Sequence, residues 1–236
     1  MVHRADPVCE AVSTLLLGHR GARAIVSTPE NTLASFDLCL QHGCDGFEFD
    51  VRRTSDGVPV VCHDATFRGL RIAQTLERDL APWQLQGFLP TLEQVLSRYA
   101  LLCFLDVEIK DPGIEPQIVD LLRRYTPVKG YVVTSFRPDI LLRLRLMDSA
   151  VPLGLIWEES ISEERSTEWR SLPVAWALPK HSLLDGVLAA ELLAAGKRIG
   201  TWTVNDPSEM KRLATLGAEI LISDDTAGLA NTFAVG

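Results

Sequence analysis

Eight short apolar runs alternate with longer amphipathic stretches along the chain, and this alternation restricts the fold more than any other feature of the sequence. The runs are rich in Leu, Val and Ile, as expected for parallel strands covered on both faces. They lie at residues 13–19, 46–52, 101–109, 130–135, 152–157, 173–179, 198–204 and 219–223. An eightfold strand–helix alternation predicts an α/β fold, a TIM-type (β/α)8 barrel with an outer ring of helices.

Helix start and stop signals lie between these runs. Thr91 and Gln94 have the spacing of a capping box at the start of LEQVLSRY, and Pro207 stands where the first turn of a helix would begin. Glycines mark the expected helix ends at Gly43, Gly196 and Gly217. The stretches between the runs therefore fit helices that link successive strands.

One segment departs from this alternation. Residues 57–64, GVPVVCHD, follow a Ser-Asp-Gly turn and predict an additional strand, and an irregular stretch then continues to Pro90. No linker, low-complexity tract or sequence repeat interrupts the rest of the chain. We expect a single barrel domain over residues 1–236, in which residues 57–90 form a short excursion over the mouth of the barrel after its second strand.

Composition limits the classes of function. The 236 residues are 47% hydrophobic, enough for a sizeable core, and their formal net charge of -8 argues against binding to nucleic acid or to an anionic membrane surface. No apolar run is long enough to span a membrane, and Asp6 and Glu10 argue against a signal peptide. Five cysteines without CxxC spacing indicate neither a disulfide framework nor a zinc site, so we expect reduced thiols in a cytoplasmic protein. The sequence does not indicate an oligomeric state.

Unexpected polar residues collect where four of the predicted strands end. Enzymes built on such barrels carry their reactive groups at the carboxyl ends of the strands, so these positions are the candidates for chemistry. They are His19 and Arg20, Glu48 and Asp50, His63 and Asp64, and Glu108 and Lys110.

Three of these residues are carboxylates suited to a metal ion. The alternation of a strand puts Glu48 and Asp50 on the same face of GFEFDVR, and Glu108 adds a third carboxylate from the next barrel strand. Burial of unpaired carboxylates is costly, and a divalent cation relieves that cost. Oxygen ligands without cysteine favour Mg2+ or Ca2+ over zinc. A lone acid is more commonly exposed or salt-bridged, but recurrence at successive strand ends favours a metal site.

The remaining residues suit proton transfer and anion binding. His19 and His63 are candidates for a general acid and base, although a lone histidine after a strand is more often an ordinary hydrogen-bonded residue. Arg20, with its planar fork, and Lys110, as a point charge, suit a phosphate. An anion, a metal ion and two histidines indicate phosphoryl chemistry that needs no covalent nucleophile from the protein.

A set of short motifs runs in a fixed order along the chain. The motifs are HRG (19–21), PENT (29–32), EFDV (48–51), TSDG (54–57), VVCHD (60–64), PTLEQVL (90–96), EIK (108–110) and TWTVN (201–205). In this order they resemble the glycerophosphodiester phosphodiesterase family, over nearly the whole chain from about Ser13 onward. After the last predicted strand the sequence has Ser223-Asp224-Asp225-Thr226 where that family usually has threonine-aspartate-x-proline.

The resemblance implies a TIM-type barrel that hydrolyses glycerophosphodiesters to glycerol 3-phosphate and an alcohol, by attack of the glycerol 2-hydroxyl on phosphorus and opening of the cyclic phosphate by water. The implied site residues are the metal ligands Glu48, Asp50 and Glu108, the acid–base pair His19 and His63, and the substrate-binding residues Arg20, Lys110 and Trp202. Trp202 is expected to form an apolar wall for the glycerol moiety, with a place in the core as its alternative. The expected partner is a small-molecule glycerophosphodiester, with neither nucleic acid nor stable membrane association.

Two further residues of the PENT motif have a simpler explanation. Glu30 and Asn31 precede a predicted helix, so capping and the helix dipole account for them, although Glu30 could orient a neighbouring site residue.

Three other interpretations stay open from the residues alone. The same site could act on an acylated lipid, as in lysophospholipase D-like relatives, and a long apolar groove near Phe67, Trp83, Phe88 and Trp202 would favour this alternative. The barrel could bind phosphate esters without catalysis, or it could be a metal-dependent aldolase. The aldolase does not explain the second histidine or Lys110.

Overall fold

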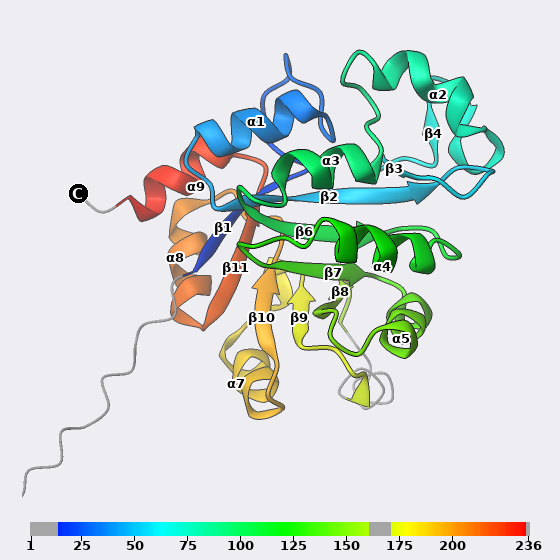
Figure 1. Ribbon diagram of the computed structural model, residues 1–236. Helices are drawn as coiled ribbons and strands as arrows, with labels where there is room; N and C mark the ends of the chain where they lie inside the picture. Colours follow the sequence, from blue (N-terminus) through cyan, green and yellow to red (C-terminus); the bar gives the residue numbers. More distant parts are fainter. Residues whose placement is uncertain (1–13, 161–170, 235–236) are drawn as a thin grey trace, which may run out of the picture.

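The computed structural model describes residues 14–160 and 171–234, and Figure 1 shows a central barrel of strands with helices around its outside. Each barrel strand overlaps one of the runs predicted from the sequence. The strands are β1 (Leu15–His19), β2 (Gly46–Arg53), β6 (Phe104–Ile109), β7 (Tyr131–Ser135), β8 (Leu153–Trp157), β9 (Trp176–Pro179), β10 (Arg198–Thr201) and β11 (Ala218–Ser223).

Hydrogen bonds between neighbouring strands close the barrel. The strand order is β1-β11-β10-β9-β8-β7-β6-β2, and β1 also pairs with β2. All of these pairings are parallel. The closed, parallel barrel confirms the predicted TIM-type fold and brings the carboxyl ends of its strands to one end of the molecule.

Several strands are shorter than the apolar runs that predict them, and two of these show why. The run at 101–109 becomes a strand only at Phe104, because Leu101 and Leu102 lie in a turn and are 70% and 59% exposed. The run at 198–204 ends as a strand at Thr201, and Trp202 continues it only as an isolated bridge to Lys180. Apolar composition alone does not separate a strand from an adjoining turn.

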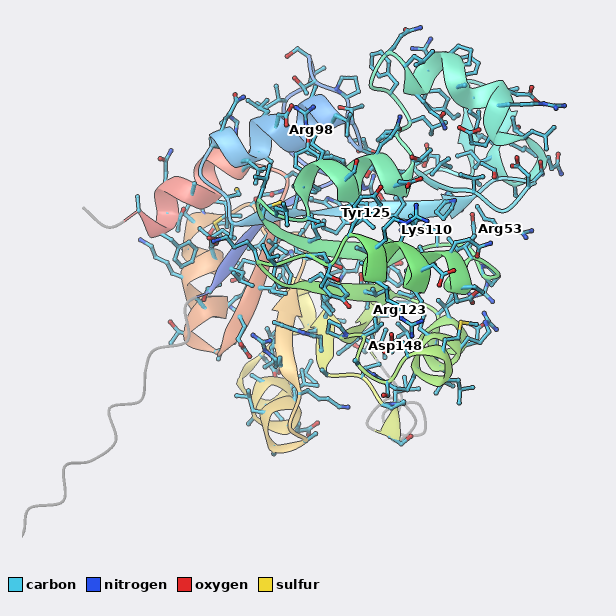
Figure 2. All side chains as sticks on the ribbon, in the orientation of Figure 1. Arg53, Arg98, Lys110, Arg123, Tyr125 and Asp148 are labelled. Carbon is cyan, nitrogen blue, oxygen red and sulfur yellow. The ribbon has the colours of Figure 1, made fainter. Side chains whose placement is uncertain are left out.

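Helices link successive strands and cover the outside of the barrel (Figure 1). Those that the structure describes around the barrel are α1 (Leu33–Gln41), α3 (Leu92–Tyr99), α4 (Glu115–Arg124), α5 (Pro138–Met147), the short 3-10 helix η2 (His181–Leu183), α7 (Gly186–Ala194), α8 (Pro207–Thr215) and α9 (Thr226–Phe233). The capping box of Thr91 and Gln94 and the position of Pro207 at the start of α8 are confirmed. An ion pair of 2.9 Å joins Arg123 of α4 to Asp148, just after α5 (Figure 2).

Apolar side chains form two layers on either side of the barrel wall. Leu17, Trp176 and Ile220 belong to the cluster that fills the inside of the barrel. A larger cluster lies between the strands and the helices, where the rings of Phe36 in α1 and Phe47 in β2 stack with centroids 4.1 Å apart. Because side chains alternate along β2, packing of Phe47 outward turns Glu48 inward.

Residues 57–90 leave the barrel after β2. The predicted additional strand is confirmed as β3 (Pro59–Val61), which pairs antiparallel with the end of β2. It is followed by β4 (Thr66–Phe67), β5 (Leu70–Arg71), the 3-10 helix η1 (Ile72–Gln74) and α2 (Glu77–Gln84), which lie near the carboxyl end of β2 (Figure 1). Ile72 and Leu80 anchor a small separate core there. The extent of one domain over residues 1–236 stays a prediction.

Four cysteines, Cys39, Cys44, Cys62 and Cys103, are buried and free. Cys9, Ser13 and the two acidic residues weighed against a signal peptide lie outside the described residues. Over residues 14–160 and 171–234, no helix combines the length and apolar character that crossing a membrane requires.

Candidate active site

A cavity of about 370 Å3 opens at the carboxyl ends of the barrel strands. Charged residues line one half of it and mostly apolar residues the other. The lining residues are His19, Arg20, Glu48, His63, Asp106, Glu108, Lys110, Phe136, Ile156, Glu158, Leu178, Trp202 and Ile222. Seven of the eight residues predicted for the site are among them, and the eighth, Asp50, is buried beside Arg20 and Lys110. The structure therefore brings the whole predicted set together.

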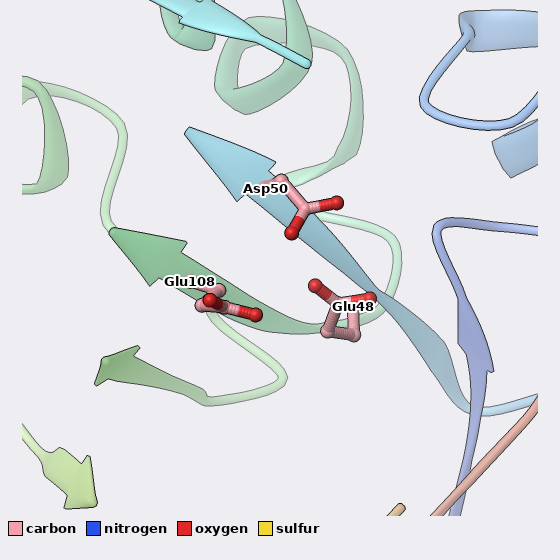
Figure 3. A group of neighbouring side chains, drawn as sticks. All are labelled: Glu48, Asp50 and Glu108. Atoms are coloured by element: carbon pink, nitrogen blue, oxygen red, sulfur yellow. The ribbon is translucent and has the colours of Figure 1, made fainter. Parts of the chain in front are cut away.

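The three carboxylates predicted to hold a metal lie on adjacent strands. Glu48 and Asp50 project from β2 and Glu108 from β6, with Asp50 and Glu108 directly paired in the register of the two strands (Figure 3). One carboxylate oxygen from each lies within 4.8 Å of the other two, and all three side chains are buried. This is the convergence expected from the two-residue period of the strand.

Two cations face these carboxylates. Lys110 Nζ lies 2.9 Å from Asp50 Oδ1 and 2.5 Å from Glu108 Oε1, and Arg20 Nε lies 3.2 Å from Asp50 Oδ2. Burial alone would raise the pKa of Asp50, but Lys110 and Arg20 outweigh it and hold that pKa below its ordinary value. Asp50 is therefore ionised and anchors both cations.

The charges of the other two carboxylates, Glu48 and Glu108, are less fully compensated by nearby positive groups. Burial raises the pKa of Glu48 well above its ordinary value, and the charges of Asp50 and Glu108 add to the increase. Burial and the charge of Asp50 raise the pKa of Glu108 to about 7, with Lys110 opposing them. Glu48 Oε1 is buried without a hydrogen-bond partner in the described chain. A hard divalent cation fits this set of oxygen atoms, because it would supply the charge and the partner that Glu48 lacks.

Arg20 is held in place from several sides. Its backbone φ of +54° is in the left-handed region, and its N–H donates to Glu48 Oε2 at 3.0 Å. Its Nη1 donates to Glu30 Oε1 at 2.9 Å, and Glu30 also binds Arg23. Glu30 therefore contacts Arg20, as the suggestion that it orients a neighbouring site residue requires.

Asn31 does not cap the first helix, so its explanation as a capping residue is wrong. Thr32 caps α1 by accepting from the Ser35 N–H. Asn31 instead has a φ of +57° and turns its side chain inward, where Nδ2 donates to Asp50 Oδ2 at 2.8 Å. A contact between residues 19 positions apart overrides the local capping preference.

The imidazole of His19 is oriented by Asp224. Nδ1 lies 2.7 Å from Asp224 Oδ1, and Nε2 lies 3.9 Å from Glu48 Oε2. Hydrogen bonds from His19, Arg23 and Asn205 outweigh the effect of burial and hold the pKa of Asp224 below its ordinary value. The carboxylate therefore accepts, so Nδ1 carries the proton and Nε2 has a free lone pair on the cavity side. Burial lowers the pKa of His19, which favours this neutral form.

His63 also lines the cavity and follows β3, which pairs with the end of β2. Its Nδ1 lies 2.9 Å from Asp64 Oδ1, and its backbone carbonyl accepts from Arg52 Nε at 2.8 Å. Its side chain is 35% exposed, against 12% for His19. The two histidines therefore border the same cavity in different surroundings, one enclosed and one open to solvent.

Trp202 forms part of the apolar half of the cavity. Its Nε1 donates to the Leu178 carbonyl at 3.0 Å, and its ring meets that of Phe136 at 86° with centroids 5.4 Å apart. Trp202 is therefore a cavity wall with a fixed orientation and not a fully buried core residue.

Four cavity or partner residues were missed in the sequence. Glu158 and Asp224 directly follow predicted strands, and Asp106 alternates with Glu108 on one face, so the rule of polar residues at strand ends could have found them. Phe136 gives no such signal. Burial raises the pKa of Asp106 to about 8, with a hydrogen bond from Thr134 opposing the increase.

Comparison with known proteins agrees with this geometry. The model of the glycerophosphoryl diester phosphodiesterase family matches residues 19–227. The chain belongs to that family. YhdW of Bacillus subtilis (strain 168) is 30% identical over 230 residues, which cover 89% of this chain and 93% of YhdW. A glycerophosphodiester phosphodiesterase of Caldanaerobacter subterraneus subsp. tengcongensis is 27% identical over 93% of this chain and 98% of its own length.

A solved phosphodiesterase structure has the same fold. The Oleispira antarctica phosphodiesterase, solved in complex with the product sn-glycerol-3-phosphate, matches with a TM-score of 0.79 and 25% identity over 93% of this chain and 96% of that chain. Membership of this family makes the protein a phosphoric diester hydrolase and supports glycerophosphodiester phosphodiesterase activity. The interpretations as a mere binding protein or as an aldolase are thereby set aside.

The lysophospholipase D-like alternative is not favoured. An apolar groove near Phe67, Trp83, Phe88 and Trp202 would favour it, but Phe67 and Trp83 pack against each other with ring centroids 5.8 Å apart, on the separate core of the excursion. Within the described chain, no residue between 65 and 90 lines the cavity.

Proposed function

We propose that this protein hydrolyses glycerophosphodiesters to glycerol 3-phosphate and an alcohol by metal-dependent acid–base catalysis at this cavity. The observation that carries the proposal is the convergence of three buried carboxylates, two cations and two histidines on one cavity. The sn-glycerol-3-phosphate found in the Oleispira antarctica relative supports a substrate of this class.

Glu48, Asp50 and Glu108 would hold the metal ion, Mg2+ or Ca2+. When bound, such an ion neutralises charge on the nonbridging oxygens of the phosphate. Arg20 and Lys110 bind the same phosphate, supported by their contacts with Glu30 and with the carboxylates. Because these positive groups are fixed before substrate arrives, they stabilise the charge that builds up in the transition state.

His19 acts as the general base. Its neutral ring, held through Nδ1 by Asp224, presents Nε2 to accept the proton of the glycerol 2-hydroxyl, whose oxygen attacks phosphorus. The P–O bond to the head group breaks, and a cyclic glycerol phosphate forms. Water then opens this ring and yields glycerol 3-phosphate.

His63 acts as the general acid. It donates a proton to the oxygen of the departing head-group alcohol, and its greater exposure suits alcohols of different sizes. In the second step it accepts the proton of the attacking water, while His19 returns a proton to the glycerol oxygen. The protons therefore balance over one turnover, and neither histidine needs outside exchange.

The carbon backbone of the glycerol packs on Trp202, whose ring is fixed by its hydrogen bond to Leu178. The substrate is a small molecule, and we propose a cytoplasmic location.

The test compares glycerophosphocholine with an analogue that lacks the 2-hydroxyl. Phosphorus NMR follows each reaction, in wild type and in His19→Ala. We expect glycerol 3-phosphate from glycerophosphocholine only, with a transient cyclic phosphate, and no turnover by His19→Ala. Hydrolysis of the analogue at the rate of the natural substrate would show direct attack by water and overturn the role of the 2-hydroxyl.

A further inference from the structure

Glu158 brings a carboxylate to the apolar half of the cavity, and neither the sequence motifs nor the proposed mechanism uses it. It follows β8 directly and lines the cavity together with Phe136, Leu178 and Trp202. Over residues 14–160 and 171–234, no residue gives its side chain a hydrogen bond or an ion pair. A polar group of this kind among apolar walls commonly fixes the orientation of a ligand.

The backbone holds the end of β8 close to the Trp202 wall. The Lys180 N–H donates to the Trp157 carbonyl at 2.8 Å, and Lys180 also forms the bridge to Trp202. The His181 N–H donates to the Trp202 carbonyl at 2.8 Å. Glu158, the residue after Trp157, is thus joined through two short backbone links to the wall on which the glycerol packs.

The geometry of the histidines assigns the glycerol arm of the substrate to this half. Thr203, the neighbour of Trp202, places its Oγ1 3.5 Å from Nδ1 of His19, so the proposed base and the apolar wall adjoin. His63, on the other side, is the more exposed histidine and serves the departing alcohol. A glycerol whose 2-hydroxyl meets His19 therefore extends along Trp202 toward Glu158.

We propose that Glu158 accepts a hydrogen bond from the terminal hydroxyl of the glycerol moiety and thereby selects deacylated glycerophosphodiesters over lysophospholipids. This inference rests on the proposed function. An acyl ester at the terminal position removes the donor and brings a hydrocarbon chain against the charged carboxylate of Glu158, which has no partner among the described residues. Sites that hydrogen-bond a substrate hydroxyl discriminate strongly against analogues that lack it.

A cationic head group is the competing occupant, because an ammonium ion also suits a carboxylate beside aromatic rings. The place of the phosphate site and of His19 in the polar half of the cavity argues against a head group at Glu158. Glycerol attacks through its 2-hydroxyl and must lie between the phosphate site and His19, and Trp202 and Glu158 are the next surfaces along that arm. The head group leaves on the His63 side.

The test measures kcat/KM with four soluble substrates. They are glycerophosphocholine, its analogue without the terminal hydroxyl, its 1-butanoyl ester, and glycerophosphoglycerol. The enzymes are wild type, Glu158→Leu, Glu158→Gln and the matched control Glu159→Leu. The control makes the same change one residue further on; both residues are exposed, but Glu159 does not line the cavity.

Wild type should prefer glycerophosphocholine over the two modified glycerols by about 100-fold or more. In Glu158→Leu, kcat/KM should fall roughly tenfold or more on glycerophosphocholine and on glycerophosphoglycerol alike. The preference for glycerophosphocholine over the two modified glycerols should shrink to within about threefold. Glu158→Gln, which keeps a neutral acceptor, should retain part of the preference. Glu159→Leu should behave as wild type.

Three results would overturn the inference. Equal turnover of glycerophosphocholine and its deoxy analogue by wild type would exclude the hydroxyl contact. A loss confined to glycerophosphocholine would assign Glu158 to the cationic head group. An unchanged preference in Glu158→Leu would exclude any role for Glu158.

Failure of the proposed function can be told apart from failure of this inference. If metal-loaded wild type turns over none of the substrates, calorimetry compares its binding of glycerol 3-phosphate and of 2-hydroxypropyl phosphate. Tighter binding of glycerol 3-phosphate that Glu158→Leu abolishes would still support the hydroxyl contact. Equal binding of the two ligands by wild type would reject it.

Discussion

Nδ1 of His19 lies 2.7 Å from Oδ1 of Asp224, which joins the end of β1 to the segment after β11 at the cavity. Arg23 Nη1 and Asn205 Nδ2 also contact this carboxylate, at 3.1 and 3.2 Å. The carboxylate is therefore fixed from three sides and in turn fixes the ring. His19 can present only Nε2 to a substrate.

Replacement of Asp224 should impair the chemical step more than substrate binding. In Asp224→Ala the ring of His19 is free to turn and to change tautomer, so kcat should fall by about 10- to 100-fold while KM changes less than about threefold. Asp224→Asn keeps an acceptor for Nδ1 but loses the charge. Its kcat should therefore lie between those of wild type and Asp224→Ala. Steady-state kinetics on glycerophosphocholine checks this, and a wild-type kcat in Asp224→Ala would rule out the positioning role.

Removal of His63 should matter most for poor leaving groups. If His63 protonates the departing alcohol, the turnover rate of His63→Ala on glycerophosphocholine should be about 10²- to 10⁴-fold lower than that of wild type. A substrate with a nitrophenol head group needs no acid, so His63→Ala should approach wild type on it, whereas His19→Ala should stay inactive. Equal losses on both substrates in His63→Ala would contradict this division of roles.

Binding of a divalent cation should stabilise the fold through the three carboxylates. At 100 times the dissociation constant, a ligand of the folded state adds about 2.7 kcal/mol. Mg2+ or Ca2+ should therefore raise the melting temperature of wild type and change that of Glu48→Gln much less. In chelator, Glu48→Gln should be at least as stable as wild type, since burial disfavours the charged form of Glu48. The same upward shift in both proteins would place the ion elsewhere.

Asp106 should make the stability of the metal-free protein depend on pH. Burial raises its pKa in the folded state to about 8, whereas in the unfolded chain it is about 3.9. The protonated group therefore contributes its full stability below about pH 4 and loses it as the pH rises through about 8. In chelator, the stability of Asp106→Asn relative to wild type should increase by about 1.4 kcal/mol per pH unit between roughly pH 5 and 7.

Denaturant titrations at several pH values measure this difference. Asp120→Asn, the same change at an exposed residue of α4, is the control. A constant difference between Asp106→Asn and wild type would mean that Asp106 is ionised in the folded protein.

Whether the sequence predicts a site residue depends on how far along the chain the contacts that place it extend. Glu48, Asp50 and Glu108 were found because a period of two along each strand and the convergence of strand ends in a barrel place them without further information. Glu158 and Asp224 obey the same rule, but they lie outside the motifs that carried the resemblance.

Other contacts had no local signal. The inward turn of Asn31 toward Asp50 depends on a backbone with positive φ and on a strand far along the chain, so capping preference alone assigned it wrongly. Phe136 is one of many apolar residues that follow a strand, and only the closure of the barrel brings its ring against Trp202. Likewise, the apolar character of Leu101 and Leu102 predicts a strand, whereas the structure places them in an exposed turn.

The most direct test of the account is release of glycerol 3-phosphate from glycerophosphocholine by the purified protein, first in chelator and then with Mg2+ or Ca2+ restored. Metal-dependent catalysis at the three carboxylates predicts no release in chelator, recovery with one of the two ions, and no recovery in Glu108→Gln, which lacks one of the carboxylates. Undiminished release in chelator, or recovery in Glu108→Gln equal to that of wild type, would contradict it.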